Sequence, residues 1–432
     1  MATVFVVRPE LGNGIVSGKY FLFYLSMGVL AVVSVVYGLV RRPAVRFGWI
    51  DGLILLYGAG TLSVSYFIHS SEAVTKHVLL ALIVLLYFYF RMFLSTSKSN
   101  GYWLTLFFLV TGLVEAFWGL RQLYGLEHSQ HALFRLTGSF FNPGPYACYL
   151  AVVLPAAFGY LLRDRNCTKA KFRIRYWPLY LRWGVAALTC VAIISVLPAT
   201  MSRASWLAAI GGCGIVIYSK ILNRFIGKFS RLQILTFSCL LAGVLALCVL
   251  GGMGMYRLKK DSADGRVLTW KIALQTAVHH PLGVGIGNFS GSYGHTQADY
   301  FATGQGTEQE EYVAGNPEYG FNEYLQIAVE QGAIPFALFL GIMGYSVYAG
   351  IRRKRTAATA SLVALLIAAM ASYPFSVLPF LIAMAFLLAR IHLECGNSGI
   401  QKFKDSKIPS FGYSVIRSCV GAVLVAGCLY SR

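Results

Sequence analysis

Residues 20–40 read YFLFYLSMGVLAVVSVVYGLV, an unbroken apolar run that is as long as a bilayer is thick. About 20 such residues in a helix cross the roughly 30 Å of hydrocarbon in a membrane. No small-residue cleavage site accompanies the run, so we expect it to stay in place as the first membrane helix and not to be removed as a signal peptide. Similar runs recur along the chain.

The composition agrees with a membrane protein. Of 432 residues, 57% are hydrophobic and only 12% are charged, which excludes a soluble multidomain, collagen-like, coiled-coil or disordered chain. The net charge of +20 comes from basic residues in short runs between apolar stretches, a pattern that fixes membrane orientation and does not indicate a nucleic-acid partner. Nine cysteines show no metal or disulfide spacing.

Hydropathy windows of about 19 residues predict about twelve spans. The runs are continuously apolar, which favours helices over a transmembrane barrel. We therefore expect an all-α, polytopic helical bundle with an N-terminal part at 1–252 (about eight spans), a large outer loop at 253–323 that contains short interfacial helices, and a C-terminal part at 324–432 (about four spans). The predicted spans are 20–40, 48–68, 77–94, 101–120, 140–162, 178–198, 204–222, 232–252, 332–351, 357–373, 375–393 and 410–430.

Basic residues predict the orientation of these spans. If the twelve spans are right, the basic clusters all fall on one side, which should be the cytoplasmic side. The long loop then faces outward. The clusters lie at 41–46, 163–175, 220–231, 352–355 and 402–407.

Inside the long loop, residues 264–278 have the pattern of a helix capped by Ser262 or Asp264 and stopped by Pro281. Val267, Trp270, Leu274 and Ala277 fall on one of its faces. We expect this helix to lie on the outer membrane boundary.

Two arginines are suited to an anionic ligand. Arg266 is expected in the first helical turn, where free amides and a guanidinium would suit a phosphate or diphosphate. Pairing with Asp261 or Asp264, or contact with lipid headgroups, is the alternative. Arg203 stands at the outer end of a span, where it is either an interfacial anchor or a ligand group. Arg121 and Arg135 face the same side and could add to the positive field.

Two further stretches of the loop stand out. The glycines of 281–289 favour a tightly turned backbone over a phosphate-binding loop. In 316–332, Asn322, Glu323, Gln326 and Glu330 bring polar groups to a membrane entrance at near-helical spacing. A carboxylate beside an apolar wall there could accept a proton from an attacking hydroxyl, although a solvated helix start explains each residue equally well.

Four stretches in this order resemble the O-antigen ligase-like family, a group of bacterial polytopic glycosyltransferases that contains O-antigen ligases, lipid-linked glycan polymerases and protein O-oligosaccharyltransferases. The resemblance covers roughly 136–340. The stretches are LTGSFFNP at 136–143, SRASW at 202–206, GRVLTW at 265–270 with HPLGVG at 280–285, and FNEYLQ at 321–326 followed by EQG at 330–332.

The resemblance implies a GT-C-like fold in the bacterial inner membrane with an active site that faces the periplasm. It implies a glycan donor on undecaprenyl diphosphate and an acceptor hydroxyl on a glycolipid, glycan or protein. Arg203 and Arg266 fall where the family places arginines that hold the diphosphate. Two arginines can replace the divalent cation of other sugar transferases, so we expect no metal and no other cofactor.

One position departs from the family pattern: many ligases have a histidine where this chain has Phe321. Glu323 or Glu318 could act as the base instead, His279 or His280 could reach in, or leaving-group stabilisation alone could suffice. We favour the carboxylates. The expected catalytic residues are therefore Arg203, Arg266, Glu323 and Glu318, and the expected substrate-binding residues are Arg121, Arg135, Asn142, Trp270, His280 and Asn322.

Two other functions stay open. A transporter or flippase of lipid-linked sugars would suit about twelve spans, but the sequence lacks matching halves and its polar residues cluster in one outer loop. The protein could also be a catalytically inactive family member, because Phe321 stands in place of the family histidine.

Overall fold

The computed structural model describes residues 1–8, 10–11, 13–41, 47–67, 73–162, 177–225 and 260–393. Within these ranges the chain is all-helical and has no strand, so the predicted all-α class is confirmed. The elements are η1 (Ala2–Phe5), α1 (Gly14–Arg41), α2 (Trp49–Phe67), α3 (Ala73–Thr96), α4 (Lys98–Leu123), α5 (Pro143–Leu161), α6 (Trp177–Val196), η4 (Leu197–Thr200), α7 (Arg203–Phe225), α9 (Lys260–His279), α10 (Phe289–Ala302), α11 (Glu308–Val313), α12 (Glu323–Gln331), α13 (Ala333–Arg352), α14 (Thr356–Ala369), η5 (Pro374–Ser376) and α15 (Leu378–His392).

Most predicted spans coincide with a helix, and those at 232–252 and 410–430 lie outside the described residues. By length and composition, 6 of the described helices could cross a membrane, namely α1, α3, α4, α5, α6 and α13. The helices α14 and α15 are apolar but shorter than a full span. The chain thus has the helices of an integral membrane protein, while the number twelve stays a prediction.

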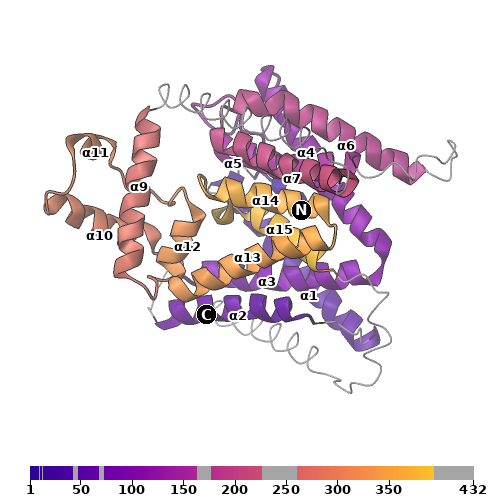
Figure 1. Cartoon of the computed structure of the whole chain (residues 1–432), viewed down its shortest axis with the longest axis horizontal. Coiled ribbons are helices and arrows are strands. Elements are labelled where there is room, and N and C mark those ends of the chain that lie inside the picture. The colour runs from indigo at the N-terminus through magenta and orange to yellow at the C-terminus, as the bar shows by residue number, and fades with distance from the viewer. Residues whose placement is uncertain are drawn as a thin grey trace.

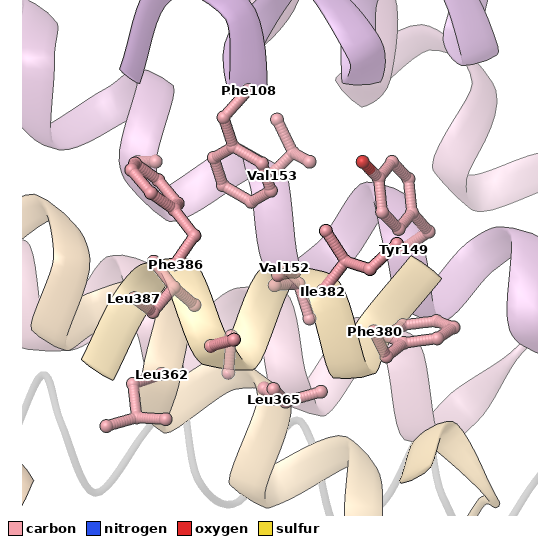
Figure 2. Close-up of a cluster of buried hydrophobic side chains, with 14 of the residues drawn as sticks. Phe108, Tyr149, Val152, Val153, Leu362, Leu365, Phe380, Ile382, Phe386 and Leu387 are labelled. Atoms are coloured by element: carbon pink, nitrogen blue, oxygen red, sulfur yellow. The ribbon is translucent and has the colours of Figure 1, made fainter. Parts of the chain in front are cut away.

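The centre of the bundle is formed by α5, α7 and α14, and α15 packs beside them. Figure 2 shows the side chains that fill this region: Phe108 from α4, Tyr149 and Val153 from α5, and Phe380 and Phe386 from α15. Ala360, Ala364 and Ala368 of α14 are fully buried. These small side chains allow the helices to approach closely, as is usual in membrane bundles.

The short helices of the predicted outer loop lie together at one end of the bundle (Figure 1). There α9 runs across the ends of the bundle helices, α10 and α11 lie beyond it, and α12 lies between α9 and α13. This part has its own apolar core, which includes Leu268 and Ile272 of α9, Phe289 and Tyr293 of α10, and Val329 of α12. The described part of the loop is therefore folded around a core of its own.

One feature of α9 differs from the prediction. The helix begins at Lys260, so Ser262 and Asp264 lie inside it and do not cap it. Residues 260–264 contain neither Gly nor Pro, so no residue there stops the helix from extending upstream. Arg266 consequently lies in the second turn, where the backbone amides are already used in the helix. Any anion site at Arg266 must then rely on side chains.

The expected tight turn in 281–289 is present. Gly283, Gly285 and Gly287 have φ angles of +89°, +86° and +93°, which is the region that glycine adopts most easily. Gly283 lies against the backbone of Gly332, which also has a positive φ of +82°. The Val284 and Gly285 amides donate to the carbonyls of Val329 and Glu330 over 2.9 Å each. This backbone contact joins the end of α9 to the junction of α12 and α13.

Candidate functional site

The four motif stretches meet at the end of the bundle that faces α9. The Arg266 guanidinium donates from Nη1 to the carbonyl of Ala371, at 3.1 Å, in the segment that follows α14. Its Cζ atom also lies 5.2 Å from the centre of the Phe321 ring, which is a cation–π distance. Two contacts thus hold one arginine of the loop against two other parts of the chain.

Arg203 is the first residue of α7, and neighbouring side chains fix this helix end. The Ser205 hydroxyl donates to Cys148 Sγ of α5 at 3.2 Å, and the hydroxyls of Ser202 and Ser205 are 2.8 Å apart. The preceding Met201 has a positive φ of +52°, so the chain turns sharply between η4 and α7. The sequence around Arg203 therefore forms a sharp turn and the start of α7.

The two arginines are close enough for their charges to interact. Burial lowers the pKa of Arg266 first, and the positive charge of Arg203 lowers it further. Among the described residues, neither arginine forms an ion pair with a carboxylate. The alternative pairing of Arg266 with Asp264 is thus absent, and the side chain of Asp261 lies outside the described part. Two neighbouring positive charges without a described counter-charge favour binding of an anion.

Aromatic side chains line the site beside Arg266. The Tyr373 ring stacks on Tyr319 with centroids 4.7 Å apart and planes 7° apart. Phe321 meets the same ring edge-on at 5.5 Å, and Phe141 of the 136–143 stretch lies 6.4 Å away. The first and last motif stretches are therefore joined through Tyr373, a residue that the sequence did not single out.

A cavity of about 370 Å³ opens between α9 and the segment that precedes α12. Arg266 and Phe321 lie at its wall, and Thr269, Tyr293 and Asn316 add polar groups. A cavity of this size beside a positive charge can hold part of a polar ligand. It therefore extends the arginine site in the direction of α10.

Phe321 is the position at which the resemblance led us to expect a histidine. Its φ of +48° is uncommon for a residue with a side chain, and such strained positions often occur at functional sites. Its ring lies between the Arg266 guanidinium and the Tyr373 ring. It thus supports the two side chains, but it has no atom that can accept a proton.

Glu323, one of the two expected bases, is buried at the start of α12 and 3% exposed. Its Oε1 atom accepts the backbone N–H groups of Phe375 at 2.6 Å and Ser376 at 3.1 Å. Burial raises its pKa to about 8 despite these hydrogen bonds. Because Oε1 is already engaged, the placement of Glu323 favours a role in holding the 371–376 segment.

We expect Glu323→Gln to keep the fold and to alter its pH dependence. Between about pH 4.3, where a free Glu ionises, and pH 8 the folded protein keeps a proton that the unfolded chain has lost, so stability falls as pH rises. A glutamine accepts the same N–H groups and does not ionise. In thermal unfolding in detergent, the variant should exceed the wild type at pH 9 and match it at pH 4, where the unfolded Glu is still largely protonated. A variant that is less stable at pH 9 would contradict this.

Glu318, the other expected base, is exposed. Burial raises the pKa of the Tyr319 hydroxyl, and the neighbouring Glu318 charge raises it further. The charge of Glu318 also raises the pKa of Tyr373. The carboxylate therefore lies beside the aromatic cluster and remains open to solvent.

The residues expected to bind substrate are distributed unevenly. Asn142 caps α5 by accepting the Gly144 N–H group through Oδ1, and Asn322 caps α12 by accepting two backbone N–H groups. Trp270 lies one turn after Arg266, and its buried indole N–H has no hydrogen-bond partner among the described atoms. These three residues lie close in sequence to the site, but the two caps are already engaged in local structure.

The other three lie further out. Arg121 forms an ion pair with Glu127 at 3.4 Å, and Arg135 is exposed on the following loop. His280 follows the C-terminal end of α9, about 20 Å along the helix axis from Arg266 at roughly 1.5 Å per residue. It lines a second cavity of about 720 Å³ that also contains His295 and Asn288. The alternative in which His279 or His280 reaches the arginines therefore requires movement of the helix.

A buried polar cluster that the sequence did not reveal shapes the 136–143 stretch. Ser139 donates its hydroxyl to Glu115 Oε1 at 2.6 Å and its amide to Oε2 at 3.1 Å. Lys19 donates to the Ser139 hydroxyl at 3.2 Å. Gln122 Oε1 accepts the Gly138 amide at 2.7 Å. An acid within an apolar helix, such as Glu115 in α4, was a signal that could have been used.

No group of three or more His, Cys, Asp or Glu side chains is placed to hold a metal in the part of the chain that the structure describes. The expectation that the protein needs no metal stays a prediction.

The fold and site together define an all-helical integral membrane protein with a partly buried, positively charged site at one end of its bundle. Residues 188–340 match the family model described as O-antigen ligase. The match confirms the resemblance to an O-antigen ligase-like family that the motifs indicated. It spans Arg203, Arg266 and Phe321. A comparison with curated proteins found no match.

Proposed function

We propose that the protein is a membrane glycosyltransferase that moves an undecaprenyl-diphosphate-linked oligosaccharide or polysaccharide to an acceptor hydroxyl at the periplasmic face. The family indicates glycosyl transfer of the ligase or polymerase type. The observation that carries the specific proposal is the proximity of Arg203 and Arg266, which come from separate parts of the chain and form no ion pair with a described carboxylate. A diphosphate carries the complementary charge.

The arginine pair suits the departing group of such a transfer. The acceptor oxygen forms a bond to the anomeric carbon, and the bond from that carbon to the phosphate oxygen breaks with its electron pair. Negative charge therefore grows on the diphosphate during the reaction. Preorganised donors at that position lower the barrier, and their effect is strongest where water is excluded. No metal is required for this step.

The proton of the acceptor hydroxyl needs a base, and we assign this role to Glu318. Its carboxylate is exposed beside Tyr319 and Tyr373, whereas Oε1 of Glu323 already accepts two backbone N–H groups. An exposed carboxylate can also be reached by a large acceptor such as a glycolipid or a growing glycan.

Charge distribution supports an outward-facing site. Helix α13 begins at Ala333, next to the glycine turn at the end of the bundle that α9 crosses, and ends at Arg352, which is followed by Arg353 and Lys354. The far end of α13 is therefore basic. Basic residues mark the cytoplasmic side, so the arginine site should face the periplasm.

We expect Glu318→Gln to lower glycan transfer by about 100-fold, the low end of the range for loss of a general base. Glu311→Gln, which changes an exposed acid of α11, is the matched control and should keep full activity. Transfer is measured in a deletion strain that expresses each variant at equal membrane levels. If Glu318→Gln is fully active and Glu323→Gln is not, the assignment of the base is wrong.

A purified-protein assay with lipid-linked glycan and acceptor tests the function itself. A transferase forms a new glycosidic bond in detergent, whereas a transporter or an inactive family member forms none. Glycan length in a deletion strain then distinguishes a polymerase from a ligase, which differ in their acceptor. Loss of a polymerase leaves single repeat units on the carrier, and loss of a ligase leaves long unattached chains.

A further inference from the structure

Tyr373 is a buried residue whose ring is held by its aromatic neighbours. Its side chain is 7% exposed and is surrounded by three aromatic rings: Tyr319 stacked at 4.7 Å, Phe321 edge-on at 5.5 Å, and Phe141 at 6.4 Å. The ring cannot change rotamer without displacing one of these neighbours. The direction of its hydroxyl group is therefore set before any ligand arrives.

The backbone around Tyr373 is anchored on both sides. Two residues earlier, the carbonyl of Ala371 accepts from Arg266 at 3.1 Å. Two and three residues later, the amides of Phe375 and Ser376 donate to the buried Glu323 carboxylate. The site thus fixes Tyr373 through the same arginine that we assign to the diphosphate. Such support is what a preorganised donor needs.

The hydroxyl of Tyr373 is available for a ligand. No hydrogen bond joins it to another residue within the described ranges, although the hydroxyl and the Arg266 guanidinium are near enough to affect each other electrostatically. Burial raises the pKa of this phenol, and Cys148 and Glu318 raise it further, so it keeps its proton at neutral pH. It can therefore donate a hydrogen bond but cannot serve as a base.

We propose that Tyr373 is a third, uncharged hydrogen-bond donor to the diphosphate, beside Arg203 and Arg266. This inference rests on the proposed transferase function and names a further residue of the same site. As the glycosidic bond breaks, the electron pair goes to the phosphate oxygen, and the Tyr373 O–H group donates to the developing negative charge. The acceptor proton passes to Glu318, and Tyr373 keeps its own proton throughout.

The proposal gives a reason for the unusual residue at position 321. Phe321 supplies no polar atom, but it contacts both Arg266 and Tyr373 and thereby fixes the distance between them. The Tyr373 ring, which carries a phenol hydroxyl, lies edge-on against Phe321 at 5.5 Å. The aromatic cluster therefore serves to place a donor.

Tyr373→Phe tests this role because it removes only the hydroxyl and leaves the ring stack in place. Tyr312→Phe is the matched control, since it removes an exposed tyrosine hydroxyl on α11, outside the proposed site. With full-length protein in nanodiscs, we expect Tyr373→Phe to lower kcat for glycan transfer by about 10- to 100-fold without changing KM for the acceptor. Its affinity for undecaprenyl diphosphate should fall by about tenfold, as expected for loss of one hydrogen bond to a charged group.

Three results would overturn the assignment of Tyr373: unchanged kcat and unchanged undecaprenyl diphosphate affinity, an equal loss in Tyr312→Phe, or a loss of activity that is accompanied by a lower thermal midpoint. Arg266→Ala in the same assays separates this inference from the proposed function. If Arg266→Ala also binds undecaprenyl diphosphate and transfers glycan normally, the proposed function fails. If only Tyr373→Phe behaves like the wild type, the inference about Tyr373 fails alone.

Discussion

Replacing Arg266 or Arg203 with alanine should reduce glycan transfer by about 1000-fold, the upper range for loss of one donor to a developing negative charge. Each variant removes one of the two positive charges that we assign to the diphosphate. Arg266→Ala also removes the hydrogen bond to Ala371 and the contact with Phe321, so its effect should be at least as large. Transfer is measured in cells that lack the native gene, after membrane levels have been matched.

Two controls make this result specific. Arg352→Ala removes an exposed positive charge at the opposite end of α13 and should leave transfer unchanged. Arg266→Lys keeps the charge but loses the two-pronged guanidinium, so it should be intermediate. Full transfer by both alanine variants would show that the arginine pair does not carry the reaction.

Gly332→Ala should destabilise the fold strongly, by about 3 kcal/mol or more, because a buried backbone clash adds to a strained φ. A Cβ atom at this position would lie 2.4 Å from the backbone carbon of Leu282 and 2.8 Å from the amide nitrogen of Gly283. Its φ of +82° also disfavours any residue with a side chain. Neither the backbone at Gly332 nor the backbone at 282–283 can move freely, because the Ala333 amide donates to the Pro281 carbonyl at 2.9 Å.

Gly344→Ala in α13 is the matched control. Its Cβ would meet nothing within 4 Å, so the substitution should be neutral or stabilise the helix by roughly 0.5–1 kcal/mol. Thermal unfolding in detergent, followed by tryptophan fluorescence, compares the two variants. We also expect Gly332→Ala to lose transfer, because this contact docks the α9 unit on the bundle. A variant as stable as Gly344→Ala would disprove the structural role of the contact.

The sequence predicted the helices well because long apolar runs have few alternatives in a membrane. It also predicted that Arg203 and Arg266 share one site, but only through the order of four motifs. The predicted start of α9 was wrong by about one helical turn. Ser262 and Asp264 are good capping residues, yet no residue upstream of them in the described helix prevents it from extending.

Other parts of the site could not be predicted because they depend on contacts between distant residues. Tyr373 belongs to no motif, and its importance arises only where it meets Tyr319, Phe321 and Phe141. The engagement of Glu323 by the amides of Phe375 and Ser376 likewise follows from the packing of α12 against the segment after α14. Local patterns do not contain this information.

A structure of the full-length protein with undecaprenyl diphosphate bound would test the central claim most directly. We predict that the phosphate oxygens lie within hydrogen-bonding distance of both the Arg203 and the Arg266 guanidinium, at the end of the bundle crossed by α9. A lipid diphosphate bound elsewhere, or one that touches neither arginine, would contradict the proposed function.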